Sequence, residues 1–359
     1  MVATSPVASA TDAGTAPSRG SVRRPAGALR RRRILGLVAL VLLLGLAVAA
    51  SVAIGAKAIP PAAVWDALVS PSGTEDDIVV WSLRVPRTLL GVLVGAALGL
   101  AGALIQGYTR NPLADPGLLG VNAGAAFLAV CAISLLGVTS LLGYLWFAFV
   151  GALAAGVVVY LLGSTGRGGP TPVTLALAGA AVSTLLHALT QAVLLRDLRA
   201  LEAYRFWVVG ALAGRDAQVA AHVVGFIVAG AVLALVTAPA LNAVSLGDDV
   251  ARGLGQSVRR ARVLGIVAVT LLAGGATAAC GPIAFVGLVV PHVVRAFTGP
   301  DYRWLLPCAA LSGAVLLLAA DVVGRIVVRP SELPVGVVLA LLGGPLFIAL
   351  VRRRRMVAL

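Results

Sequence analysis

The amino-acid sequence predicts an all-α polytopic membrane protein with ten transmembrane helices. Hydrophobic residues fill 60% of its 359 positions, and the mean hydropathy is +1.01, whereas a soluble domain is about 45–50% apolar. The apolar residues fall into long runs, and a helix of about 20 such residues crosses the hydrocarbon core of a bilayer. Clusters of four arginines stand before the first run and after the last. We therefore expect a multi-pass protein of the cell membrane.

The first 33 residues are expected to form a disordered cytoplasmic tail. Residues 1–28 are rich in Ala, Ser, Thr, Gly and Pro, and such a segment buries too little apolar surface to fold. A cleaved signal peptide is the alternative, because Arg30 to Arg33 precede an apolar run. That run covers 34–56, which is longer than the roughly 7–15 apolar residues of a signal peptide. The pattern therefore favours a tail that is kept.

Nine apolar runs free of Asp, Glu, Lys and Arg follow one another along the chain. Six are simple predicted spans, at 34–56, 88–109, 117–136, 141–163, 173–195 and 219–238. The remaining three cover 263–294, 304–320 and 333–351.

The run 263–294 decides the number of spans. As one tilted helix it gives nine, but Gly281-Pro282 interrupts it, and two helices joined there give ten. Arginines in short loops prefer the cytoplasm, so the arginine clusters at both ends predict two cytoplasmic termini and an even count. We therefore expect a ten-helix permease domain at 34–351 and a basic cytoplasmic tail at 352–359.

Two apolar segments are too short to cross a bilayer as plain helices. Residues 206–214 suggest a half-helix or re-entrant segment on the outer side, and 283–294 contains Pro291. Short, Gly/Pro-interrupted segments are typical of transport paths. Five helices in each half allow an inverted five-plus-five repeat. Glycines at four-residue spacing, such as Gly95 and Gly99, predict close helix packing within one bundle.

The sequence lacks the patterns of an enzyme or a metal site. The apolar runs contain no HExxH, GxSxG or P-loop motif and no carboxylate pair. Cys131, Cys280 and Cys308 lie far apart, so they form no metal-binding pattern. The net charge of +14 comes largely from arginines between apolar runs, which makes it a topology signal. We expect no catalysis, no bound cofactor or metal, and no nucleic-acid partner.

Ionisable residues within the apolar runs are few. Asp321 stands four residues before Arg325, which places both on one helix face as a structural pair. His187 and Gln191, also four apart, suggest an interhelical hydrogen bond or a polar path. The alternative function is a proton-coupled secondary transporter that uses Asp321 or His187.

Two loops on the cytoplasmic side have distinctive sequences. Residues 110–117 read RNPLADPG, and the two prolines predict a rigid connection. Residues 239–262 contain LGDDVARGLGQSVRRAR, which predicts a short amphipathic helix, a glycine turn and a second helix start. Anchoring to the lipid surface and docking to another protein are both open for this second loop.

Between Leu83 and Leu350 the chain resembles the iron-siderophore, haem and cobalamin permease family of type II ABC importers. The blocks that carry the resemblance are LRVPRTLLGVLVGAALGLAGALIQGYTRNPLADPGLLGVNAGA, the loop at 247–260, GPIAFVGLVVPHVVRAFTGPDYRWLLP and ELPVGVVLALLGGPLFI. They occur in the family's order. The resemblance implies a permease subunit that imports iron-siderophore or related metal chelates.

The resemblance also implies partners. These are two cytoplasmic ATPase subunits that use ATP and Mg, an extracytoplasmic binding protein, and a second permease subunit, identical or paralogous, within the lipid bilayer. This chain itself carries no ATP site.

Three groups of site residues follow from the same resemblance. The ATPase-coupling loop corresponds to Gly247, Asp248, Arg252, Leu254 and Gly255. Docking of the binding protein corresponds to Arg84, Arg87 and Arg325. The cytoplasmic gate corresponds to Asn111 and Leu113, with a second element at Thr171, Pro172 and Val173. Pro172 and Val173 depart from the small polar residues that the family has there.

Overall fold

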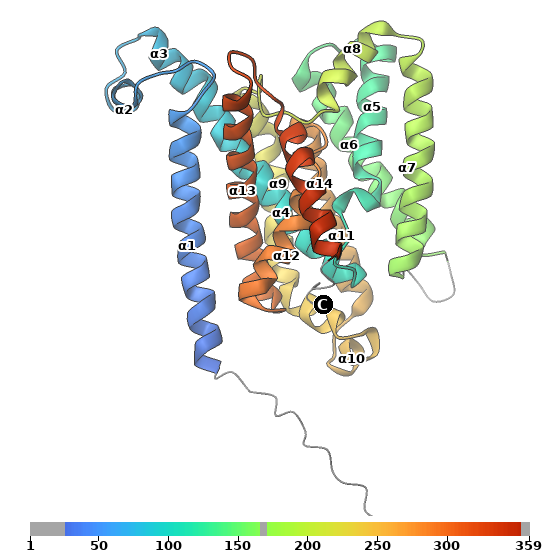
Figure 1. The fold of residues 1–359 in the computed structure, drawn as a ribbon. Coiled ribbons are helices and arrows are strands. Elements are labelled where there is room, and N and C mark those ends of the chain that lie inside the picture. The colour runs from blue at the N-terminus through green and yellow to red at the C-terminus, as the bar shows by residue number, and fades with distance from the viewer. Residues whose placement is uncertain (1–25, 166–170, 353–359) are drawn as a thin grey trace, which may run out of the picture.

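The computed structural model describes residues 26–165 and 171–352, which form one bundle of helices (Figure 1). No strand occurs within these two ranges. The predicted tails at 1–33 and 352–359 lie mostly outside them. The disorder predicted for residues 26–33 is wrong, because they already belong to the first helix. Arg352 is the last residue of the final helix.

Ten apolar helices make up the bundle. Seven are long and apolar enough to cross a membrane: α1 (Ala26–Ala53), α4 (Val85–Thr109), α6 (Leu141–Gly163), α7 (Pro172–Leu194), α9 (Ala217–Ser245), α11 (Val258–Cys280) and α13 (Tyr302–Val327). Three are apolar but shorter: α5 (Val121–Leu136), α12 (Val286–Thr298) and α14 (Val335–Arg352).

Short helical elements join them near the two ends of the bundle. They are α2 (Pro61–Val69), α3 (Glu75–Ile78), the π-helical turn η1 (Val79–Arg84), the 3-10 turn η2 (Pro116–Leu119), α8 (Leu198–Trp207) and α10 (Asp248–Gly253). In Figure 1, α2, α3 and α8 lie at the upper end of the bundle, and α10 lies at the lower end.

The ten helices coincide with the ten apolar segments of the sequence. The interruption at Gly281-Pro282 is confirmed, because α11 ends at Cys280 and α12 begins only at Val286. Helix α9 extends beyond its predicted end, since it continues through Pro239 to Ser245.

Of the two alternatives predicted for residues 206–214, a half-helix or a re-entrant segment, the half-helix is not formed. Helix α8 ends at Trp207, and the following turn folds inward between two other helices. The amide of Ala211 donates to the carbonyl of Cys280 at the end of α11 (2.9 Å), and the amide of Gly336 in α14 donates to the carbonyl of Gly210 (3.0 Å). Trp207 and Leu212 are buried in this turn, which explains why the segment is apolar although it does not span the membrane.

Helix α4 lies at the centre of the bundle, and its most extensive contact is with α13. A Cβ added at Gly99 would overlap the carbonyl oxygen of Ala309, and one at Gly95 would lie 2.6 Å from the carbonyl oxygen of Gly313. The predicted close packing of glycines within one bundle is therefore confirmed. By contrast, α1 and α7 lie at opposite edges of the bundle (Figure 1) and are mostly exposed.

The α4–α13 contact provides a test of the fold. Gly99→Ala should lower the free energy of unfolding by about 1–3 kcal/mol, because the two backbones must separate to admit a methyl group. Gly225→Ala in α9 is the control, since nothing lies within 4 Å of a Cβ there. Thermal unfolding in detergent measures both, and equal melting temperatures would contradict the close approach.

Candidate functional site

The loop between α9 and α11 forms the structure predicted for it, within narrower limits than 239–262. Gly247, with φ +126°, precedes α10, and Gly255, with φ +76°, follows it. The amide of Gly255 donates to the carbonyl of Arg252, and that of Gln256 donates to the carbonyl of Ala251, both at 2.9 Å. Positive φ angles favour glycine, so these two residues define the turns at either end of α10.

This loop, residues 246–257, has an inner and an outer face. Asp248 points inward, where its carboxylate binds Nη2 of Arg262 (2.8 and 2.9 Å) and also pairs with Arg110. Asp249 and Arg252 pair with each other in solvent. Leu254 also faces outward and is 61% exposed. Of the residues predicted to couple this loop to an ATPase, Asp248 therefore contacts this chain itself, whereas Arg252 and Leu254 are accessible.

Asn111 and Leu113, the first predicted gate element, lie in the tightly structured segment 110–120. Oδ1 of Asn111 accepts the amide of Leu113 at 2.9 Å, and Oδ1 of Asp115 accepts the amide of Gly117 at 2.8 Å. Loss of water around Asp115 raises the pKa of its carboxyl. The rigid connection predicted from the two prolines agrees with these bonds.

Arg110 joins this gate element to the 246–257 loop. It caps the end of α4 with φ +48°, and its Nε donates to the carbonyl of Val244 at the end of α9 (3.0 Å). Its Nη2 pairs with Asp248. Local sequence reasoning missed this link because Arg110 and Asp248 are 138 positions apart.

The second predicted gate element begins α7. Thr171 accepts the amide of Thr174, whose hydroxyl donates to the carbonyl of Gly163 at the end of α6 (2.8 Å). Pro172 starts the helix, and Val173 is 67% exposed. Helix α7 meets the segment 110–120 further along.

That meeting point is Gly179, where an added Cβ would overlap the carbonyl oxygen of Leu118. Helix α7 therefore contacts η2, which follows the loop of Asn111 and Leu113, at a position eight residues beyond Thr171.

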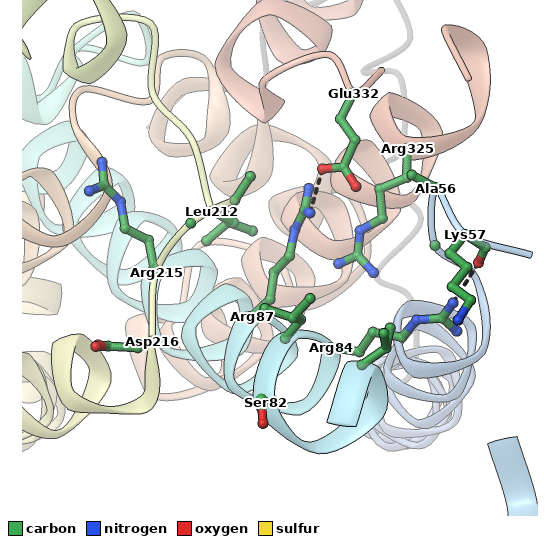
Figure 2. Close-up of a pocket in the computed structure, with 15 residues that line it drawn as sticks. Ala56, Lys57, Ser82, Arg84, Arg87, Leu212, Arg215, Asp216, Arg325 and Glu332 are labelled. Carbon is green, nitrogen blue, oxygen red and sulfur yellow. Dashed lines mark hydrogen bonds and ion pairs between the residues drawn. The ribbon is translucent and has the colours of Figure 1, made fainter. Parts of the chain in front are cut away.

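A basic cavity of about 510 Å³ opens at the other end of the bundle. The three arginines predicted to dock a binding protein, Arg84, Arg87 and Arg325, all line it (Figure 2). Other charged residues on its wall are Lys57, Arg215, Asp216 and Glu332. Five cationic side chains face two carboxylates on this wall, so the cavity carries a net positive charge. Hydrogen bonds to Glu75 and Asp76 raise the pKa of Lys57.

Two of the three arginines also stabilise the end of α1. Arg84 donates to the carbonyls of Val52 (2.9 Å), Ala53 (2.7 Å) and Lys57 (2.7 Å). Arg325 donates to the carbonyl of Ser51 at 2.6 Å. Both arginines are nearly completely buried. They occupy carbonyls that a helix C-terminus leaves unpaired.

Arg87 links two carboxylates. Its Nε and Nη2 donate to the fully buried Asp321 at 3.0 and 2.7 Å, and its Nη1 donates to Glu332 at 2.6 Å. Arg325 binds the same Asp321 through Nε at 3.0 Å. The predicted Asp321–Arg325 pair is confirmed, while Glu332 was not recognised because it lies 245 positions from Arg87.

The remaining candidates stay apart. His187 and Gln191 are both exposed on α7, and within residues 26–165 and 171–352 neither has a hydrogen-bond partner, so the interhelical bond suggested for them is not formed in this chain. Cys131, Cys280 and Cys308 are free. No cluster of three or more His, Cys, Asp or Glu suited to a metal occurs in these ranges.

Comparison with known proteins gives consistent matches. The FecCD transport family matches residues 41–353. The ferric enterobactin transport system permease protein FepD of Escherichia coli is 46% identical over 329 residues, which cover 91% of this chain and 98% of that protein. The Fe(3+)-citrate import system permease protein YfmD of Bacillus subtilis is 43% identical over 81% of this chain and 85% of that protein.

A solved structure has the same fold. It is a metal-chelate type ABC transporter in an inward-facing conformation, with a TM-score of 0.78 and 29% sequence identity. The match covers 89% of this chain and 99% of that one.

The Asp321 cluster predicts a large loss of stability in one substitution. Asp321→Ala leaves Arg87 and Arg325 without their shared buried carboxylate, so the free energy of unfolding should fall by about 3–5 kcal/mol. Asp249→Ala, which breaks an exposed Asp–Arg pair, should cost less than about 1 kcal/mol. Equal thermal unfolding of the two variants would show that the buried cluster is not a stabilising element.

Proposed function

The chain belongs to the FecCD transport family, and we propose that it is the membrane-spanning permease subunit of an ATP-driven ABC importer for iron-siderophore or related metal chelates. The family match covers most of the chain, and relatives are permeases for ferric enterobactin and ferric citrate. The protein is a transport permease of the cell membrane rather than an enzyme. ATP and Mg would be bound by two separate cytoplasmic ATPase subunits.

We propose ten membrane spans with both termini in the cytoplasm. The beginning of α1, helix α10 and the end of α14 are all directed toward the same end of the bundle (Figure 1). An inverted repeat would relate α4, α5, α6 and α7 to α11, α12, α13 and α14. The contact of α4 with α13 then corresponds to that of α11 with α6, and the contact of α5 with α7 corresponds to that of α12 with α14; all four contacts are present.

The observation that carries the coupling mechanism is the position of Asp248 between Arg110 and Arg262. The outer face of the 246–257 loop, with Arg252, Leu254 and Gly255, is the surface for an ATPase. Movement of the loop would act through Asp248 on Arg110, which directly precedes Asn111 of the gate. The Arg110–Asp248 ion pair can transmit this movement, because Arg110 must either follow Asp248 or lose its contact with it.

We propose that the substrate path lies between two permease subunits. Helices α7 and α14 each present exposed apolar residues, such as Leu177 and Leu341. A second copy or a paralogue would cover these faces in the bilayer. Walls of this kind bind a chelate weakly, which favours its release, so selectivity would rest on an extracytoplasmic binding protein.

The proton-coupled alternative is not supported. A proton carrier needs an ionisable group that water can reach, whereas Asp321 is fully buried between two arginines. His187 is accessible but stands without an acidic partner in the described part of the chain.

Reconstitution tests the transport class. Proteoliposomes that contain the permease, the ATPase subunits and the binding protein should accumulate a radiolabelled ferric chelate only when ATP is supplied on the ATPase side. Ferric catecholate and ferric citrate, assayed in parallel, would identify the cargo. Uptake driven by a pH gradient in vesicles without the ATPases would instead support the proton-coupled carrier.

Asp248→Asn tests the coupling link. Loss of the charge weakens both arginine contacts, so uptake per ATP hydrolysed should fall by roughly tenfold if about 1.4 kcal/mol of coupling is lost. ATP hydrolysis by the assembled complex should persist. Asp66→Asn is the control, since it removes the same charge from an exposed position of α2 at the opposite end of the bundle. An unchanged ratio of uptake to hydrolysis in Asp248→Asn would overturn this assignment.

A further inference from the structure

Glu332 occupies one end of the Arg87 guanidinium at the wall of the basic cavity (Figure 2). Its Oε2 accepts Nη1 of Arg87 at 2.6 Å. The side chain is 28% exposed, whereas Asp321, on the other side of Arg87, is fully buried. A carboxylate arriving from outside can therefore compete for Nη1 but cannot reach the atoms that bind Asp321.

The charges in this cluster balance only when Glu332 is included. Asp321 is shared by Arg87 and Arg325, so one carboxylate serves two guanidinium groups. Glu332 supplies the second negative charge. The cavity wall otherwise carries Lys57, Arg84 and Arg215 on the positive side and Asp216 on the negative side. Removing Glu332 from Arg87 creates a site for one incoming anion.

We infer that Glu332 is an internal substitute for a carboxylate of the binding protein, which displaces it from Arg87 when the two proteins dock. The inference rests on the proposed docking of that protein at this cavity. A carboxylate is the chemistry that fits, because it reproduces the contact that Glu332 makes. Docking is then an exchange of one carboxylate for another, and Arg87 is never left without a counter-ion.

The exchange reaches α14 through residues 328–334, the strap that joins α13 to α14. Three contacts hold this strap: Glu332 on Arg87, the amide of Leu333 on the carbonyl of Gly324 (3.0 Å), and Arg329 on the carbonyl of Gly55 (2.9 Å). Helix α14 begins at Val335, directly after the strap. Release of Glu332 therefore removes the side-chain contact that ties the start of this helix to α4.

Binding affinity tests the exchange. Glu332→Gln should tighten binding of the cognate binding protein to the permease–ATPase complex by about fivefold. The incoming carboxylate then no longer has to displace a partly exposed ion pair, and a pair of this kind has about that effect on affinity. Asp216→Asn removes the same charge from the same cavity without touching Arg87, and Asn retains the N-cap at the start of α9. Asp216→Asn should change the binding affinity by less than about twofold, because it alters only the electrostatic potential of the cavity.

A third variant separates failure of the exchange from failure of the docking site. Arg87→Gln should weaken binding of the binding protein, and unchanged binding would show that the cavity is not the docking site. Weakened binding in Arg87→Gln, together with equal effects of Glu332→Gln and Asp216→Asn, would overturn the exchange alone.

Hydrogen exchange examines the strap directly. In the unmodified complex, addition of the binding protein should speed exchange of the Leu333 amide. In Glu332→Gln this amide should exchange faster before the binding protein is added. Equal exchange in the presence and absence of the binding protein would show that Glu332 stays on Arg87 during docking.

Discussion

The buried carboxylate of Asp321 is the point on which the end of the bundle that carries the basic cavity depends. A charge inside a bilayer protein is costly unless it is paired, and here two arginines from different helices converge on it. One of them, Arg325, extends further to the last carbonyls of α1. The same cluster therefore joins α4 and α13 and attaches α1, a helix that is otherwise largely exposed at the edge of the bundle.

Helix α4 connects this cluster to the opposite end of the bundle. Arg87 lies in its first turn and Arg110 is its C-terminal cap, and each arginine pairs with a partly exposed carboxylate on a loop, Glu332 and Asp248. Between them the helix is buried and is pressed against α13 through its glycines. A helix packed in this way transmits movement as a unit. The contacts proposed to change, Arg87 with Glu332 and Arg110 with Asp248, therefore lie at the two ends of α4.

The sequence predicted the helices better than their ends and their partners. Apolar runs located all ten helices, and the Gly281-Pro282 interruption was visible because it is a local property of the chain. The continuation of α9 through Pro239 was not visible in the sequence, because packing against α4 and α11 overrides the tendency of proline to end a helix. Arg295 is buried against Gln106, 189 positions away, and Glu332 lies 245 positions from Arg87. Such pairs are created by tertiary packing, which spacing along one chain does not report.

The distribution of charge also agrees with the proposed partners of this chain. The paired carboxylates and arginines discussed above lie near the ends of helices, and the exposed faces of α7 and α14 are mainly apolar or small. His187 is a titratable group exposed on α7, but it has no acidic partner in the described part of the chain. In the proposed mechanism, energy and selectivity therefore enter at the two ends of the bundle, through the 246–257 loop on one side and the basic cavity on the other. The proposed roles of Asp248 and Glu332 correspond to these two entrances.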